Sequence, residues 1–204
     1  MDNVNTTTVK RVNVWKMTMT AMLSAIAFIL MFLEFSIPVM PEFIKMDFSD
    51  LPAVVGTFAM GPVSGVIICL IKNLLHLLMT NTGGVGELSN FILGAIFVLP
   101  AGLIYKKWKS KKSAIIGALL GALLMALVSV VSNYFIVYPV YYNFMPKEAV
   151  LNAYQLILPW VKSIPQCLIV FNAPFTFFKG LCSVLITLVI YKPLSPFLKG
   201  NYRK

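Results

Sequence analysis

The sequence predicts an all-α integral membrane protein with six transmembrane helices and with both termini on the cytoplasmic side. Three observations support this fold class: the apolar composition, the lengths of the apolar segments and the placement of the positive charges. Of the 204 residues, 59% are hydrophobic and 12% are charged, whereas a soluble domain contains roughly 25% charged residues. The mean hydropathy is +0.85. A water-soluble domain of this size cannot bury so much apolar surface, and the same composition excludes a disordered chain.

The apolar segments define the expected helices. Residues 17–36 form the first, with about the 20 residues that a bilayer core requires. Residues 51–79 are too long for one span and contain Gly61-Pro62, which is unfavourable inside a helix because proline lacks the backbone N–H. We therefore divide them into two shorter helices, which are acceptable if protein rather than lipid covers their broken ends. The expected helices of this single membrane domain (1–204) are 17–36, 51–60, 62–79, 87–105, 113–138 and 167–191, with a glycine-rich loop at 80–86 and a long loop at 139–165.

The positive charges favour six helices over five. The chain has 17 Lys and Arg against 7 Asp and Glu, a formal net charge of +10. In a soluble protein this excess would suggest nucleic-acid binding, but here the cations lie at the ends of apolar segments. With six helices, the tail 1–16, the lysine-rich loop 106–112 and the tail 192–204 all face the cytoplasm, as the positive-inside rule requires. The placement of charge thus predicts a multi-pass protein of the cell membrane, whose partner is the lipid bilayer and not nucleic acid.

The sequence lacks the motifs of common catalytic and nucleotide-binding sites. It contains no P-loop, no HExxH, no GxSxG and no paired-cysteine motif. The only histidine is His76, and the three cysteines lie in apolar segments without metal-ligand spacing. We therefore predict no enzyme activity, no metal site and no cofactor. A transport process driven by ATP would have to take its energy from another subunit.

Polar residues within the apolar segments are the first candidates for a functional site, since a charge inside a bilayer is costly. Lys179 lies too deep in the last helix to reach the interface easily. Lys72 either binds a ligand or has a structural role, in which it extends toward the membrane interface or pairs with an acidic side chain. Asn133 either binds a ligand or forms a hydrogen bond between helices. His76 and Glu34 are predicted to be packed or interfacial residues.

The first outer loop adds acidic candidates. Asp50 directly precedes the second helix and is predicted to be its N-cap, whereas Asp47 has no such structural role. Together with the glycine-rich loop, Asn133 and Lys179, this loop predicts a mostly apolar pocket with a few polar groups in the outer half of the bundle. Its expected ligand is partly aromatic and rich in hydroxyl or carbonyl groups.

Small residues repeat along the first helix. Ala21 and Ala25 are four residues apart, and Ser24 and Ala27 extend the pattern. Such residues let another helix approach closely. The approaching helix belongs either to this chain or to a partner subunit, and the pattern alone fits both.

Four motifs occur in order along the chain: D-F-S-D-L-P at 47–52, G-P-V-x-G at 61–65, K-N-L-L-H at 72–76 and P-F-x-x-x-K-G at 174–180. In combination they resemble the riboflavin-specific S components of energy-coupling factor (ECF) vitamin transporters. The resemblance covers roughly residues 15–192. It implies a six-helix membrane subunit that captures riboflavin from outside the cell and works with a transmembrane coupling subunit and two cytoplasmic ATPases.

The resemblance also assigns residues. It implies that Ala21 and Ala25 dock the coupling subunit. Thr176 stands where the family often has Asn, and Asn172, one turn earlier, is expected to compensate. The substrate-binding residues that the matching motifs imply are Met46, Asp47, Phe48, Gly83, Gly84, Asn133, Thr176 and Lys179, with Asn172 added. Two alternatives remain open: a stand-alone facilitator for small solutes, and an S component for a different vitamin.

Overall fold

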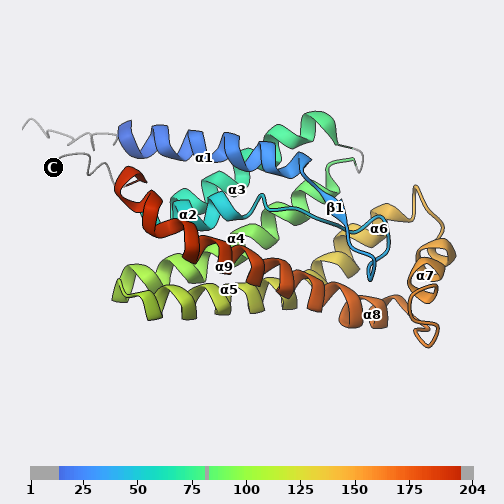
Figure 1. Cartoon of the computed structure of the whole chain (residues 1–204). Helices are drawn as coiled ribbons and strands as arrows, with labels where there is room; N and C mark the ends of the chain where they lie inside the picture. The colour runs from blue at the N-terminus through green and yellow to red at the C-terminus, as the bar shows by residue number, and fades with distance from the viewer. Residues whose placement is uncertain (1–13, 81–82, 199–204) are drawn as a thin grey trace, which may run out of the picture.

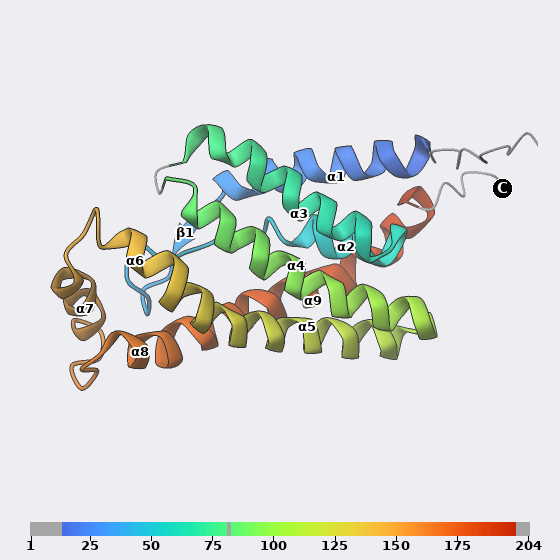
Figure 2. The same cartoon turned by 180° about the vertical axis from the view of Figure 1, so that it is seen from behind.

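The structure, a computed structural model, describes residues 14–80 and 83–198 and consists mostly of helices that run side by side along one axis (Figures 1 and 2). The start of α1 (Val14–Phe32), the end of α9 (Ala173–Leu198) and the turn between α4 (Val85–Trp108) and α5 (Lys111–Ser132) lie at one end of the bundle. We call this the lysine end, after the lysines of residues 106–112. The short elements α6, α7 and α8 lie at the opposite end, which we call the loop end.

The remaining elements complete the chain order. They are β1 (Phe35–Ser36), β2 (Lys45–Met46), α2 (Leu51–Met60), α3 (Pro62–His76), the 3₁₀ turn η1 (Leu77–Met79), the π-helical turn η2 (Asn133–Val137), α6 (Tyr138–Tyr141), α7 (Lys147–Gln155), α8 (Ile164–Cys167) and the π-helical turn η3 (Leu168–Asn172). Because α5, η2 and α6 follow one another without a break, they form one long helix, and α8, η3 and α9 form another.

Five helical segments of the described chain are long and apolar enough to cross a membrane: Val14–Phe32, Pro62–Met79, Val85–Trp108, Lys111–Tyr141 and Ile164–Tyr191. The sixth apolar helix, α2, has 10 residues. At 1.5 Å per residue it is about 15 Å long, half the thickness of a bilayer core. Gly61, with φ of 101°, separates it from α3.

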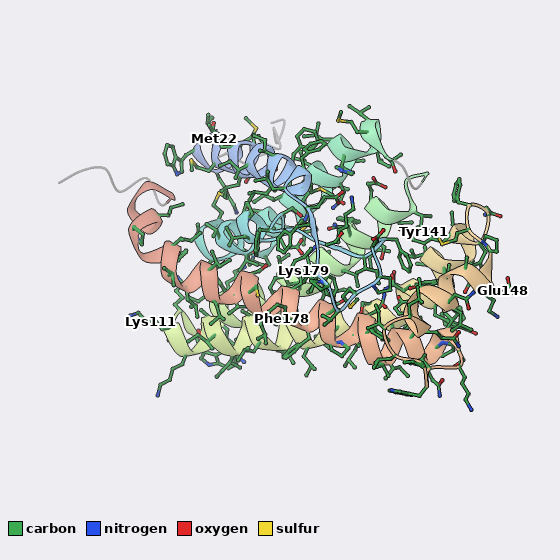
Figure 3. All side chains as sticks on the ribbon, turned by 45° about the vertical axis from the view of Figure 1, so that its right-hand side comes forward. Met22, Lys111, Tyr141, Glu148, Phe178 and Lys179 are labelled. Atoms are coloured by element: carbon green, nitrogen blue, oxygen red, sulfur yellow. The ribbon has the colours of Figure 1, made fainter. Side chains whose placement is uncertain are left out.

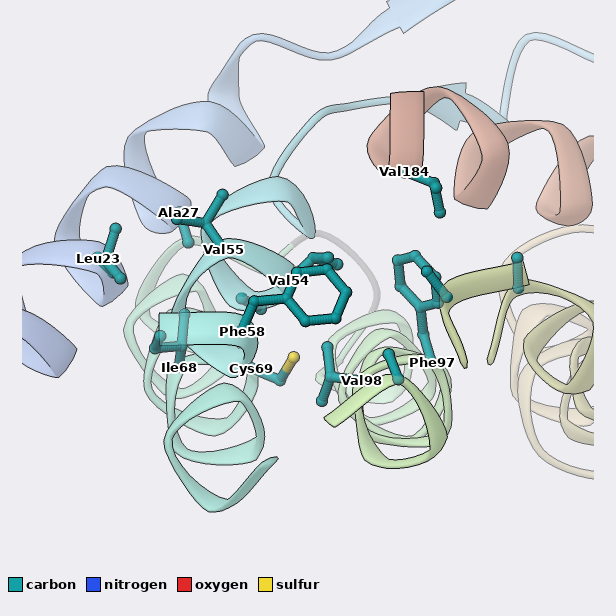
Figure 4. Close-up of a cluster of buried hydrophobic side chains, with 14 of the residues drawn as sticks. Leu23, Ala27, Val54, Val55, Phe58, Ile68, Cys69, Phe97, Val98 and Val184 are labelled. Atoms are coloured by element: carbon teal, nitrogen blue, oxygen red, sulfur yellow. The ribbon is translucent and has the colours of Figure 1, made fainter. Parts of the chain in front are cut away.

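Protein side chains surround α2, which therefore meets the condition for a half-length helix in a membrane. Every residue from Pro52 to Phe58 is buried. Figure 4 shows Val54 and Phe58 of α2 within a cluster that includes Cys69 of α3 and Phe97 of α4. Elsewhere the helices touch closely at small residues. A Cβ atom at Gly121 of α5 would collide with the carbonyl oxygen of Phe97, so this contact between α4 and α5 requires glycine.

The first helix differs from the expected span 17–36. It begins by Val14 and ends at Phe32, and the next residues form a short antiparallel pair in which Phe35 lies opposite Met46 and Ser36 lies opposite Lys45. Pro38 follows closely, and proline disfavours the helical conformation of the residue before it. Residues 1–13 of the expected tail 1–16 lie outside the described part of the chain.

The long loop expected at 139–165 contains helical elements. This segment completes α6, contains all of α7 and begins α8. In α7, Val150 and Tyr154 are four residues apart and both are fully buried, so one face of the helix packs on the bundle. The apolar residues here are separated by polar ones, which hides the helix from a search for continuous apolar runs. At the other end of the chain, α9 continues to Leu198, through the start of the expected tail 192–204.

Candidate small-molecule binding site

A cavity of about 450 Å³ opens at the loop end, between the segment that joins α1 to α2 and the helices α3, α4, α6, α7 and α9. This volume is typical of small-molecule sites. Its aromatic wall consists of Phe43, Tyr141 and Phe144, and its polar wall includes Asp47 and Lys179. Figure 3 shows Lys179 near the middle of the bundle and Tyr141 toward the loop end.

Asp47 and Lys179 belong to a buried charge cluster that also contains Asp50 and Lys72. Lys179 Nζ donates to Asp47 Oδ2 at 2.7 Å and lies 3.8 Å from Asp50 Oδ2. Lys72, which is fully buried, donates to Asp50 Oδ1 at 2.6 Å and to Ser49 Oγ at 2.7 Å. With two carboxylates and two ammonium groups, the cluster has no net charge. It ties the segment before α2 to both α3 and α9.

The N-cap prediction for Asp50 is confirmed in position but not in the role of the side chain. Asp50 occupies the N-cap position of α2, but its side chain forms no capping hydrogen bond. Its carboxylate accepts from Lys72 instead. Of the two interpretations of Lys72, the structure supports pairing with an acid, because a buried ammonium group is stable only with an opposite charge beside it.

The surroundings of Asp47 keep it ionised. Burial disfavours its charged form and would raise the pKa, but the attraction of Lys179 and Lys72, with hydrogen bonds from Lys179 and Ser49, outweighs burial and lowers the pKa below its ordinary value. A carboxyl group whose pKa is lower in the folded than in the unfolded protein stabilises the fold. This stabilisation is complete above the pKa of the unfolded protein and is lost as the pH falls through the pKa of the folded protein. Asp47 is a permanent acceptor at neutral pH.

Two further pairs of polar side chains line the cavity. Glu34 forms an ion pair with Lys45, and His76 Nδ1 lies 2.8 Å from Glu87 Oε1. Both pairs line the cavity, so the prediction that Glu34 and His76 are only packed or interfacial residues does not describe their surroundings fully. The other oxygen of Glu87 accepts from Thr80 Oγ1 at 2.9 Å.

Hydrogen bonds of Thr80 hold the glycine-rich loop next to Glu87. Gly84 N–H donates to Thr80 Oγ1 at 3.2 Å, and Gly84 has φ of 87°, in the left-handed region that favours glycine. The chain thereby turns into α4 with Glu87 in its first turn. Gly83 and Gly84 do not line the cavity, whereas Gly86 does.

A smaller cavity of about 190 Å³ adjoins the first. The two share Gly86, Asn90, Tyr141 and Lys179 as lining residues. Asn133 and Thr176 line the smaller one, so Lys179 lies where the two cavities meet. The structure thus brings four of the expected binding residues together: Asp47, Asn133, Thr176 and Lys179.

Three other expected residues lie apart from both cavities. Met46 is 3% exposed, Phe48 contacts the ring of Phe35 at a centroid distance of 6.0 Å, and Asn172 Oδ1 accepts from the Tyr154 hydroxyl at 2.7 Å. Sequence reasoning missed Glu87 and Asn90 as cavity residues. Glu87 and Asn90 are three residues apart at the start of an apolar helix, which places both on one face of it. This spacing could have identified them from the sequence.

On α1 the small residues divide into two faces. Ser24 and Ala27 are buried, Ala27 completely, whereas Ala21 and Ala25 are exposed. The half of the pattern that packs within this chain is therefore Ser24 and Ala27. The surface around Ala21 and Ala25 is left free for a neighbour outside the chain.

The fold and the cavity define a class of protein: a helical membrane protein with a binding site for a small molecule near one end of its bundle. The family described as "ECF transporter, substrate-specific component" matches residues 15–191. The chain belongs to this family, whose members are substrate-binding components of transporters rather than enzymes.

Relatives and a solved structure agree with this membership. The chain is 39% identical over 179 residues to the riboflavin transporter RibU of Staphylococcus aureus (strain TCH60), covering 88% of this chain and 89% of that protein. It is 31% identical to the riboflavin transporter FmnP of Bacillus subtilis (strain 168), covering 90% and 94%. A solved S component of a bacterial ECF transporter superposes with a TM-score of 0.71 at 36% identity, covering 90% of this chain and 97% of that one.

Proposed function

We propose that this chain captures extracellular riboflavin for uptake that partner subunits drive with ATP. The observation that carries the proposal is the charge balance of the cavity. Each acidic side chain that lines it has a partner there: Glu34 pairs with Lys45, Asp47 with Lys179, and Glu87 with His76. A ligand with a net charge would find no unpaired counter-charge among these groups, whereas an uncharged polar ligand would find donors and acceptors.

Riboflavin has the chemistry that these walls complement. Its flat tricyclic ring suits a cavity lined by Phe43, Tyr141 and Phe144. Its ring carbonyls and nitrogens would accept from Lys179 and exchange hydrogen bonds with Asn133 and Thr176, and its ribityl hydroxyls would donate to Asp47. The segments that enclose the ligand would include Met46, Phe48, Gly83, Gly84 and Asn172.

The energy for uptake would come from a transmembrane coupling subunit and two cytoplasmic ATPases, since the chain has no P-loop. The exposed face of α1 around Ala21 and Ala25 would dock the coupling subunit. We place six helices in the plasma membrane, counting α2 as the enclosed sixth, with both termini and the lysine end in the cytoplasm. The positive-inside rule supports this orientation.

Titration of the purified protein against riboflavin, with loss of flavin fluorescence as the signal, tests the ligand. We expect one riboflavin per chain, and FMN and thiamine serve as comparison ligands. Absence of binding to any flavin at micromolar concentration would contradict the proposal, and preferential thiamine binding would indicate an S component for another vitamin. Uptake into liposomes that lack the coupling subunit and ATPases would instead favour a stand-alone facilitator.

A further inference from the structure

A separate recess at the loop end, about 500 Å³ in volume, shares no lining residue with the cavity of about 450 Å³ described above. Aromatic residues including Tyr134, Phe135 and Tyr142 line it together with Lys147 and Lys162. We propose that this recess binds an anionic phospholipid, with the headgroup phosphate between the two lysines and the acyl chains along the adjoining apolar helices.

The depth of the recess matches the membrane interface. Tyr134 and Phe135 belong to the last two turns of the span Lys111–Tyr141, and Ile164 begins the span Ile164–Tyr191. Tyr134 lies 23 residues, or about 35 Å, along this helix from Lys111, slightly more than the roughly 30 Å of a hydrocarbon core. Tyr and Trp are enriched where the core meets the headgroups. We therefore place the recess at the level of the headgroups, with Lys147 of α7 beyond it.

The surface that leads from the recess toward the bilayer is apolar and uncovered. Phe135 is 70% exposed, and Ile169, one turn beyond Pro165 of the recess, is 61% exposed. Acyl chains that lie against these residues would continue directly from a headgroup in the recess. A soluble phosphate compound would make no use of this apolar surface.

The charges select an anionic headgroup. Lys147 is the first residue of α7 and Lys162 lies between α7 and α8. Neither forms an ion pair with any residue in the described ranges 14–80 and 83–198. Lys45, in β2, is already paired with Glu34. Glu148 lies at the loop end (Figure 3) but does not line the recess. Two unpaired ammonium groups at an interface attract a phosphate that carries net negative charge.

Tryptophan fluorescence tests the proposal, because Trp160 lies two residues from Lys162, whereas Trp15 and Trp108 belong to the helix ends at the lysine end. A protein with Trp15→Phe and Trp108→Phe reports on Trp160 alone. Its quenching is compared in bilayers that contain phosphatidylglycerol or phosphatidylcholine with brominated acyl chains. From about 1 kcal/mol per lysine near an anionic surface, we expect phosphatidylglycerol to be preferred roughly tenfold or more.

Variants show whether the two lysines cause this preference. Lys147→Gln with Lys162→Gln should abolish it, and Lys147→Arg with Lys162→Arg should retain it. The matched control, Lys111→Gln with Lys112→Gln, removes the same charge at the lysine end and should leave Trp160 quenching unchanged. Equal quenching by both lipids, or a preference that survives the Gln pair, would overturn the proposal. So would relief of quenching by millimolar glycerol phosphate, which would indicate a soluble ligand. Riboflavin titration of the Gln pair keeps this test separate from the proposed transport function, because we expect its affinity to be unchanged.

Discussion

Replacing Lys179 by Met removes the ammonium group while keeping most of the side-chain volume. In the structure this group donates a 2.7 Å hydrogen bond to Asp47 and lies 3.8 Å from Asp50. A hydrogen bond to a charged group contributes about 1.5–3 kcal/mol, which corresponds to roughly 10- to 150-fold in a dissociation constant. Because Lys179 would divide its donors between Asp47 and the ligand, we expect the lower end of this range, riboflavin binding about 10-fold weaker.

The same substitution also affects stability, and a second variant separates the two effects. Lys179→Met leaves Asp47, which is 8% exposed, without its main partner, and breaking a buried pair costs about 3–5 kcal/mol. Asp47→Asn combined with Lys179→Met removes both charges. We expect this double variant to regain most of the lost thermal stability without regaining affinity.

Both quantities are measured on purified protein, affinity by riboflavin fluorescence and stability by thermal unfolding. Lys111→Met, at the lysine end, is the matched control and should change neither. A folded Lys179→Met protein that binds riboflavin within about twofold of the parent would refute the assignment of Lys179 to the ligand. Equal loss of stability in the single and double variants would refute the importance of the Asp47 pair.

Three further predictions use other parts of the structure. Ala25→Trp, on the exposed face of α1, should preserve riboflavin affinity but abolish ATP-driven uptake in liposomes with the coupling module. Normal uptake would exclude this docking face. The control Ala27→Trp, at a fully buried position, should instead lower the unfolding temperature. Since the pKa of Asp47 is lowered, this residue stays ionised and parent affinity should be constant from about pH 8 to pH 5; a tenfold loss of affinity at pH 5 would contradict this expectation. Gly84→Ala places a side chain at φ of 87°, at a cost of about 1 kcal/mol, and should lower the unfolding temperature by about 2–4 °C; an unchanged temperature in a thermal melt would show that the loop absorbs the strain.

Local features of the sequence were sufficient to predict the class of fold. Insertion into lipid depends on the length and apolarity of each segment, so the apolar runs indicated helices where the structure has them, and Gly61-Pro62 marked the break before α3. The same approach failed at α7, because polar residues such as Asn152 interrupt its apolar ones and leave no continuous apolar run. It also failed at the end of α1, where pairing of Phe35 with Met46 replaces the last helical turn.

Part of the candidate site was also visible in the sequence. Lys179 and Asp47 were identified because a charge in or next to an apolar segment is costly and implies a role. Their pairing was not predictable, since they are 132 residues apart and hydropathy contains no information about partners. For the same reason Asp50 was predicted to cap α2, although Lys72, 22 residues away, provides a charged donor that outcompetes a backbone N–H.

The sequence by itself determined that this chain is a helical membrane protein, because this property follows from short stretches of apolar residues. Only the tertiary structure decided which charges neutralise one another and which side chains face a common cavity. Those outcomes depend on helix packing, which brings α3, α9 and the segment before α2 together across the whole length of the chain.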